Sequence, residues 1–310
     1  MKKLLPYFMI AFGAALWGLI AIFVRELKLA GLSEMEIVTV RVTWATIFLL
    51  TIGVVGYRNQ LSINVRKIPL FVGTGILSIV FFNYCYFSTI NQMSVSLAVI
   101  LLYTSPAFVT ILSFIFLKEP LHTKKILAVI GTIVGCICIA GIQTGNATSI
   151  TLVGILTGLG SGLGYALYTI FGKFALKHYK PFTVTLYTFI VATVALLPFS
   201  GIWGKLEILF SSKVLLYSAG LGLIPTVLAY FVYTWGLEKT EGSKAAVIAT
   251  VEPVVAMLIG LVVFQETLGV PQLLGSLLIL SSVIIVNLPG RKKGITMELN
   301  GDKKSSGSIG

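Results

Sequence analysis

Residues 94–121 read SVSLAVILLYTSPAFVTILSFIFLKEPL, a long apolar run with a proline near its centre and a charged turn at its end. The first part of this run, Ser94–Leu117, contains no charged side chain. A helix needs about 20 mostly apolar residues to cross the hydrocarbon layer of a bilayer, which is about 30 Å thick. The stretch therefore predicts a transmembrane helix.

The same pattern recurs along the chain of 310 residues, of which 56% are hydrophobic and 11% are charged. An ordinary globular domain is about 25% charged. Backbone polar groups in lipid must be satisfied within helices, so we expect an all-α integral membrane protein. Its ten predicted spans are Leu5–Val24, Glu34–Gly56, Ile68–Ser88, Ser94–Leu117, Thr123–Ile142, Thr151–Phe171, Phe182–Ser200, Val214–Trp235, Ser243–Phe264 and Val270–Leu288.

The formal net charge of +12 would suggest a nucleic-acid partner in a soluble protein. Here the basic residues form short clusters between apolar runs, so we expect the lipid bilayer as a partner and no nucleic acid. If the N-terminus is cytoplasmic, 18 of the 23 Lys and Arg residues lie in cytoplasmic segments. Only Arg25, Lys28, Lys205 and Lys213 lie on the opposite side, and Arg41 lies within a span. The positive-inside rule thus predicts that both termini are cytoplasmic.

An internal repeat links the fourth and ninth predicted spans. Ser105-Pro106 lies 147 residues before Glu252-Pro253, and Leu117-Lys118-Glu119 lies 147 residues before Phe264-Gln265-Glu266. Many transporters are built from two halves that retain weak similarity of this kind. The pattern indicates that the chain consists of two related halves.

The first and sixth spans match at a nearly equal offset, because Trp17 lies 148 residues before Tyr165. Each half has five spans, and an odd number makes the second half enter the membrane from the opposite side. We therefore predict inverted repeats. The predicted domains are a first five-helix repeat at 1–145, a second at 146–290 and a disordered cytoplasmic tail at 291–310.

Two closing signatures carry a resemblance to a known family: Phe116-Leu117-Lys118-Glu119-Pro120-Leu121 and Val263-Phe264-Gln265-Glu266-Thr267-Leu268. With the two five-helix units and the matching prolines, the chain resembles the EamA-type drug/metabolite transporters of bacteria over roughly residues 5 to 288. The resemblance implies a ten-helix secondary transporter of the bacterial cell (inner) membrane. It implies export of a small metabolite such as an amino acid, by alternating access around a cavity between the halves.

Two ionisable residues are predicted within spans. Glu252 lies near the centre of the ninth span, where the charged form costs at least about 2.5–3.5 kcal/mol on insertion scales. We favour a role for Glu252 in proton coupling or in binding a cationic amine, over a structural acid bonded between helices. Arg41 could form a charge pair with Glu252 or with a substrate carboxylate, or its long side chain could reach the outer interface.

Aromatic and amide side chains gather on the spans that we expect to line the centre. Their polar groups can orient a zwitterion while their rings hold an apolar side chain, although any one of them could serve packing alone. The predicted substrate-binding residues are Trp17, Asn83, Tyr84, Tyr86, Tyr103, Tyr165, Tyr168, Tyr230, Tyr233 and Glu252.

Pro106 and Pro253 each remove a backbone hydrogen bond from a helix. They occupy equivalent positions of the two repeats, so we favour a gating bend, although proline is also tolerated in membrane helices without a function. Gly154, Gly158 and Gly162 recur every four residues and predict close contact with a neighbouring helix.

Enzymatic chemistry has no visible support in the sequence. The loops are too short for a soluble catalytic domain, and no nucleophile–base pair, metal-ligand set or phosphate-binding loop stands out. We therefore expect no catalytic residues, no metal site and no cofactor, and a small-molecule substrate as the partner. The alternatives are a membrane enzyme, a biogenesis scaffold without vectorial transport, or a passive channel. The sequence makes no prediction of the oligomeric state.

Overall fold

The computed structural model describes residues 4–140 and 151–287, and over these residues it contains helices and no strands. The all-α class is therefore confirmed for the part of the chain that the structure describes. The predicted tail at 291–310, the boundary between residues 145 and 146, and both ends of the chain lie outside the described residues.

Nine helical segments within the described residues are long and apolar enough to cross a membrane. They are Leu5–Leu29, Glu34–Gly56, Val65–Gln92, Val95–Leu117, Thr123–Ala140, Leu152–Ala175, Ser212–Glu238, Gly242–Phe264 and Val270–Asn287. Each coincides with a predicted span to within a few residues. Large apolar side chains such as Phe114, Ile115 and Leu277 are exposed on their outer faces, as lipid contact requires.

The seventh predicted span differs from the prediction of Phe182–Ser200. It forms helix α10 (Pro181–Leu196), which has 16 residues and is too short to count among the nine. At a rise of 1.5 Å per residue it is about 24 Å long. Pro198 accounts for the early end, because a proline disfavours helix at the residue before it.

Five of the spans are interrupted helices. The first is divided into α1 (Leu5–Gly18) and α2 (Ile20–Leu29), the fourth into α6 (Val95–Leu102) and α7 (Ser105–Leu117), and the ninth into α14 (Gly242–Ala249) and α15 (Val251–Phe264). The third contains a π-helical segment, η3 (Gly73–Val80), between α4 (Ile68–Val72) and α5 (Phe81–Gln92). The eighth contains another, η5 (Leu223–Leu228), between α12 (Ser212–Gly222) and α13 (Ala229–Glu238). Such segments are frequent at functional sites.

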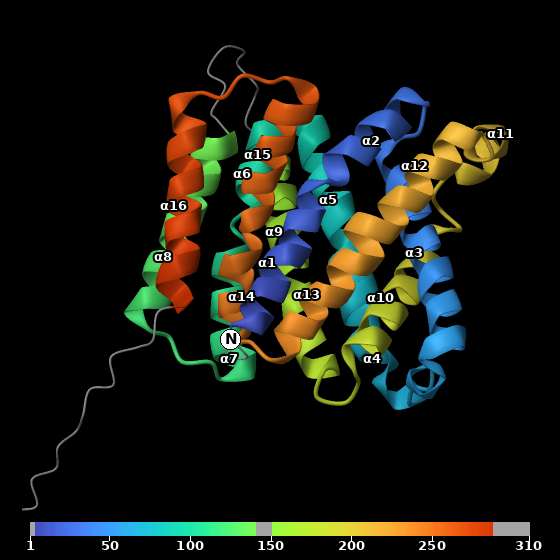
Figure 1. Cartoon of the computed structure of the whole chain (residues 1–310), viewed down its shortest axis with the longest axis horizontal. Coiled ribbons are helices and arrows are strands. Elements are labelled where there is room, and N and C mark those ends of the chain that lie inside the picture. The colour runs from blue at the N-terminus through green and yellow to red at the C-terminus, as the bar shows by residue number, and fades with distance from the viewer. Residues whose placement is uncertain (1–3, 141–150, 288–310) are drawn as a thin grey trace, which may run out of the picture.

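Helices from the two parts of the sequence lie side by side (Figure 1). Helix α1 packs against α13, and α5 packs against α9 (Leu152–Ala175). Helix α3 (Glu34–Gly56) packs against α10, where Thr46 Oγ1 lies 2.9 Å from Thr193 Oγ1. These two threonines are 147 residues apart, which is the offset of the sequence repeat.

One edge of the molecule is the pair α8 (Thr123–Ala140) and α16 (Val270–Asn287) (Figure 1). Their backbones approach closely at two glycines. A Cβ on Gly135 would lie 2.8 Å from the carbonyl oxygen of Gly275, and a Cβ on Gly275 would lie 2.6 Å from that of Gly135. A larger residue at either position would therefore push the two helices apart.

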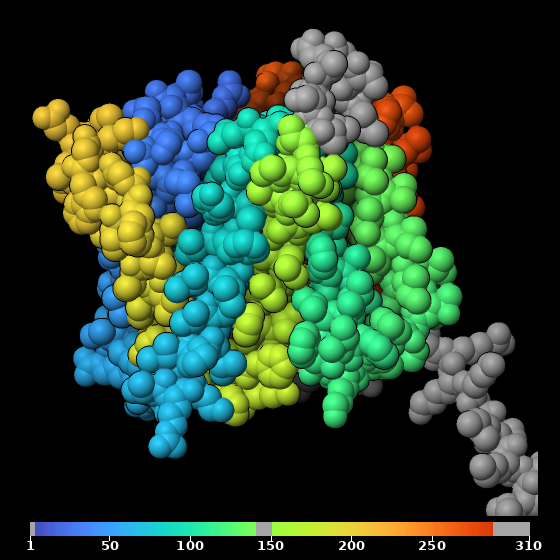
Figure 2. Space-filling model, turned by 180° about the vertical axis from the view of Figure 1, so that it is seen from behind, coloured from blue at the N-terminus to red at the C-terminus, as the bar shows by residue number. Residues whose placement is uncertain are grey.

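Helix α9 runs through the rear face of the bundle, between α5 on one side and α6 and α7 on the other (Figure 2). A Cβ on Gly162 would lie 2.9 Å from the carbonyl oxygen of Leu101. Gly154 likewise approaches the side chain of Met93, between α5 and α6, and Gly158 approaches that of Leu101 in α6. The predicted close contact of this glycine face is confirmed.

Helices α7 and α15 end in the same way. Lys118 and Gln265 both have left-handed backbone conformations, with φ of 56° and 57°. The next amide in each case bonds a carbonyl six residues back: Glu119 N to Ser113 O at 3.1 Å, and Glu266 N to Gly260 O at 3.0 Å. Helices commonly end with a residue in this conformation, and the bond satisfies a carbonyl that the helix leaves free.

Candidate substrate cavity

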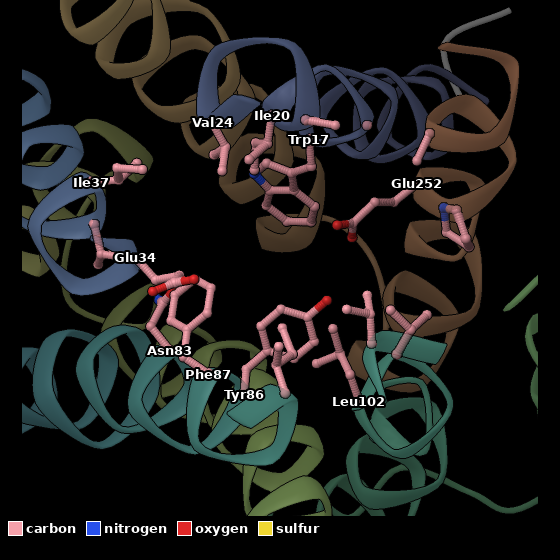
Figure 3. Close-up of a pocket in the computed structure, with 18 of the residues that line it drawn as sticks. Trp17, Ile20, Val24, Glu34, Ile37, Asn83, Tyr86, Phe87, Leu102 and Glu252 are labelled. Atoms are coloured by element: carbon pink, nitrogen blue, oxygen red, sulfur yellow. The ribbon is translucent and has the colours of Figure 1, made fainter. Parts of the chain in front are cut away.

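A cavity of about 780 Å³ lies among helices of both parts of the chain (Figure 3). Its lining comes mainly from α1, α2, α3, α5, α6 and α15, with single residues from α8, α9, α12 and α13. It reaches the end of the bundle where Lys28 and Glu34 form an ion pair of 2.6 Å. This volume is within the range of about 300–1,000 Å³ that is typical of small-molecule sites.

Glu252 points into the cavity from the first turn of α15 (Figure 3). It does not lie within an unbroken helix, because the ninth span is interrupted at Thr250. The amide groups at the start of a helix favour a negative charge, so the break supports a carboxylate at this depth. The Tyr165 hydroxyl donates a hydrogen bond of 3.1 Å to Glu252 Oε2.

Arg41 lines the same cavity from α3 and is only 6% exposed. Two of its nitrogens, Nε and Nη2, are enclosed and have no hydrogen-bond partner among the described residues. Its side chain is buried, which contradicts the alternative that it reaches the outer interface. No described carboxylate forms an ion pair with it, Glu252 included. A buried cation without an ion-pair partner is unfavourable, so an anionic group that enters the cavity beside Arg41 would stabilise it.

Aromatic rings form the floor of the cavity. The Trp17 ring centroid lies 5.0 Å from that of Tyr230 and 6.0 Å from that of Tyr165. Phe82 lies 5.7 Å from Tyr165 and 6.0 Å from Tyr86, again between centroids. These rings give an apolar surface next to the two charged groups.

Most of the predicted site residues meet at this cavity. Those that line it are Trp17, Arg41, Asn83, Tyr86, Tyr103, Tyr165, Tyr230, Glu252 and Pro253. Tyr168 and Tyr233 lie deeper, in a second and very small pocket beneath Trp17. Their hydroxyls are paired with threonine hydroxyls, Tyr168 with Thr234 at 2.7 Å and Tyr233 with Thr169 at 3.0 Å.

Tyr84 and Pro106 line neither pocket. Tyr84 is 62% exposed on the outside of the bundle, because consecutive helical residues point about 100° apart and its neighbour Asn83 takes the inner face. Pro106 is buried in the first turn of α7. Tyr84 is therefore a correction to the predicted binding set.

The sequence analysis missed several apolar residues of the same face of α5. Phe82, Phe87 and Ile90 line the cavity together with Asn83 and Tyr86. These five positions follow the helical period, which was the available signal. The prediction passed over them because it selected side chains with polar groups.

The opposite end of the bundle is closed around Glu119, whose role the sequence analysis also missed. Glu119 is 8% exposed and accepts hydrogen bonds at the start of α14. The donors are Gly242 N at 2.5 Å, Ser243 N at 3.1 Å and Ser243 Oγ at 2.6 Å. Lys125 Nζ lies 3.7 Å from Glu119 and thereby balances the buried charge.

Further ion pairs surround this closed end. Lys125 Nζ lies 2.7 Å from Glu241, and Lys244 Nζ lies 3.6 Å from the same carboxylate. Burial would raise the pKa of Glu241, but the hydrogen bond and charge of Lys125 and the nearby Lys244 outweigh it, so the pKa lies below its ordinary value. Lys173 Nζ donates to the carbonyl oxygens of Leu237 at 3.1 Å and Thr240 at 2.9 Å, at the end of α13.

A bundle of apolar spans with a cavity that reaches one end, while the other end is closed by polar contacts, is the architecture of a membrane transporter. The EamA-like transporter family model matches residues 4–141 and 152–288, which is most of the chain in two consecutive matches. The protein belongs to this family, and the resemblance inferred from the sequence is confirmed.

Relatives and a solved structure agree with this assignment. The chain is 29% identical to an "Uncharacterized transporter" of Archaeoglobus fulgidus over 89% of its length and 94% of the relative's. It is 23% identical to the "Uncharacterized inner membrane transporter YicL" of Salmonella typhimurium, over 90% and 94% of the two chains. A crystal structure matches this chain with a TM-score of 0.73 and 17% sequence identity. The match covers 90% of this chain and 95% of the other, which shows a shared fold.

Proposed function

We propose that this protein is a secondary transporter that exports a small zwitterionic metabolite, such as an apolar or aromatic amino acid, from a bacterial cell. The observation that carries the proposal is the pair Arg41 and Glu252, two oppositely charged residues that line one cavity without bonding each other. An α-amino acid presents a carboxylate and an ammonium group, which match these two residues.

Arg41 lines the cavity without an ion-pair partner among the described residues, which supports a carboxylate as the anionic group. A guanidinium and a carboxylate can form two parallel charge-assisted hydrogen bonds. Glu252, which already accepts from Tyr165, supplies the acceptor for the ammonium group. The rings of Trp17 and Phe82 then lie where an apolar side chain would be held. A phosphate ester normally requires several Arg or Lys donors together. Of the three basic residues that line the cavity, Lys28 is paired with Glu34 and Arg25 lies over Phe264, which leaves Arg41 beside the ring floor.

The two-half architecture belongs to the same proposal: ten spans in two inverted five-helix repeats. The contacts of α1 with α13 and of α9 with α5 are equivalent under the repeat, and Thr46 meets its own counterpart Thr193. We assign α10, the seventh in chain order, as the span that completes the ten, since most of its surface is covered by protein. The basic clusters support a cytoplasmic location for the closed end around Glu119, and with it a cavity that faces outward.

Transport would follow alternating access, in which the cavity opens to either side in turn. Glu252 is the candidate coupling residue, since it can exchange a bound proton for the ammonium group of the substrate. The helix breaks before Pro106 and Pro253 provide bending points in equivalent helices. Both roles, and the export direction, are part of the proposal.

The test is exchange in proteoliposomes loaded with radiolabelled L-phenylalanine or L-leucine. We expect the amino acids to exchange at least about tenfold faster than phenethylamine, which lacks the carboxylate, or hydrocinnamate, which lacks the amine. Faster exchange of a sugar phosphate or a nucleotide sugar would refute the substrate class. Absence of exchange for any member of a broad metabolite panel would count against secondary transport.

A further inference from the structure

The loops after α7 and α15 are equivalent in sequence and in backbone, but they make different contacts. Glu119 and Glu266 are 147 residues apart, and each follows a residue in the left-handed conformation. Glu119 is buried against the start of α14, whereas Glu266 is exposed. Within the described ranges, the Glu266 carboxylate has no hydrogen-bond or ion-pair partner.

The repeat identifies what Glu266 could bind. Glu119 accepts from Gly242 N, Ser243 N and Ser243 Oγ. The residues 147 positions earlier are Val95 and Ser96, the first residues of α6, and Ser96 retains the hydroxyl. The side chain of Ser94 bonds the amide of Leu97 only, so the first amides of α6 stay available.

A cation accompanies each carboxylate. At the closed end, Lys173 donates to the carbonyls of Leu237 and Thr240 where α13 ends. Its repeat counterpart at offset 148 is Arg25. At offset 147, the carbonyls that correspond to those of Leu237 and Thr240 belong to Ile90 and Met93 at the end of α5. Arg25 makes no such bonds. Its guanidinium carbon lies 4.6 Å above the Phe264 ring, at the rim of the cavity.

The two ends of the bundle thus carry the same set of groups in two different arrangements. Figure 1 places α2 and the loop from α15 to α16 together at one end, and the loop from α7 to α8 at the other. At the closed end, the acceptor Glu119 is hydrogen-bonded to the start of α14, and the donor Lys173 is hydrogen-bonded to the end of α13. At the end where the cavity reaches the surface, the equivalent acceptor Glu266 is not bonded to the start of α6, and the equivalent donor Arg25 is not bonded to the end of α5.

We propose that Glu266 and Arg25 form a second lock, which assembles only when the mouth of the cavity closes. In that state Glu266 accepts hydrogen bonds from Val95 N, Ser96 N and Ser96 Oγ. Arg25 leaves Phe264 and donates to the carbonyls of Ile90 and Met93. Glu119 then releases α14, so that one lock holds at a time. The inference rests on the proposed transport function, because it describes how the cavity changes sides.

Cysteine pairs test the geometry directly. In a background without Cys85, Cys136 and Cys138, the pair Glu266→Cys with Ser96→Cys probes the second lock. The equivalent pair Glu119→Cys with Ser243→Cys probes the existing one and calibrates the length of a bifunctional thiol reagent. We expect both pairs to be bridged by the same reagent. The 266–96 pair should be bridged about tenfold faster when Glu119 is changed to Gln.

A labelling measurement distinguishes the two carboxylates. Val24→Cys lies on the cavity lining near the mouth, and its reaction with a water-soluble maleimide reports whether the mouth is open. Glu119→Gln should slow this reaction severalfold, while Glu266→Gln should leave it unchanged or faster. Glu207→Gln, an exposed acid at the same end as the mouth but outside the lock, is the matched control and should have no effect.

The outcomes separate the lock from the transport function. If the 119–243 pair is bridged but the 266–96 pair is not, with substrate present or with Glu119→Gln, the second lock is wrong even if exchange is normal. If the 266–96 pair is bridged while no metabolite exchanges, the lock stands and the transport proposal fails. Equal labelling of Val24→Cys in all three Gln variants would also overturn the lock.

Discussion

Arg41→Met should weaken substrate binding and at the same time stabilise the protein. Arg41 is 6% exposed, and two nitrogens of its guanidinium are enclosed without a hydrogen-bond partner among the described residues. An unsatisfied buried polar group costs about 1–3 kcal/mol, so the two nitrogens cost about 2–6 kcal/mol in the empty protein. Methionine has a similar reach and no polar hydrogen, and it removes this cost apart from imperfect packing.

The same change removes the anchor for the substrate carboxylate. A hydrogen bond to a charged group contributes about 1.5–3 kcal/mol, so losing one bond should weaken binding roughly 10- to 150-fold. We expect the thermal midpoint without ligand to rise by at least about 2 °C, because about 1 kcal/mol shifts a protein of this size by that amount. The stabilisation that L-phenylalanine gives to the wild type should disappear.

Thermal unfolding of the detergent-purified protein, with and without L-phenylalanine, measures both effects in one experiment. Arg41→Lys is the matched control. It keeps the charge but offers a single ammonium group in place of the planar fork, and it should fall between the other two proteins in affinity. An Arg41→Met protein that binds L-phenylalanine as tightly as the wild type does would refute the assignment of Arg41 as the carboxylate anchor.

Three further predictions concern single side chains. Glu252→Gln should remove the pH dependence of net transport while sparing exchange, because glutamine imitates the protonated acid; a proteoliposome assay between pH 6 and 8 measures this, and an unchanged profile would leave Glu252 as a structural acid. Gly162→Leu should destabilise the protein by about 1–3 kcal/mol through overpacking, whereas Gly56→Leu, where an added Cβ meets nothing within 4 Å, should have little effect on the thermal midpoint. Glu241, whose pKa is lowered from 4.5, should stabilise the closed end above pH 4.5 and lose this effect as the pH falls through the lowered value, so Glu241→Gln should lower the midpoint at pH 7 and match the wild type in strong acid.

Hydropathy predicted well the nine helices of the described residues that are long and apolar enough to cross a membrane, because lipid leaves the backbone no alternative to the helix. The end of α10 was missed although Pro198 is plainly present. The prediction followed apolar character beyond the proline, into a segment that folds as turns. Hydropathy also could not predict the helix breaks inside apolar runs, because no cluster of polar residues marks the interruption at Thr250.

The candidate site was partly predictable, for a different reason. Polar residues within spans identified Arg41 and Glu252, and both line the cavity. It was harder to predict which face of a helix points into the cavity. Asn83 and Tyr84 are neighbours in sequence, but only Asn83 lies inward. The role of Glu119 depends on a contact with Ser243, 124 residues away, which no local pattern could indicate.

The glycine contact between α8 and α16 has a consequence for how the chain is made. Gly135 and Gly275 cover each other's backbone, and they are 140 residues apart in the sequence. At a translation rate of about 5–20 residues per second, α8 exists for roughly 7–30 s before its partner has been synthesised. During this interval its bare backbone strip faces lipid, insertion machinery or the α8 of another nascent chain. We expect pairing of two such strips from separate chains to compete with the native contact of α8 and α16.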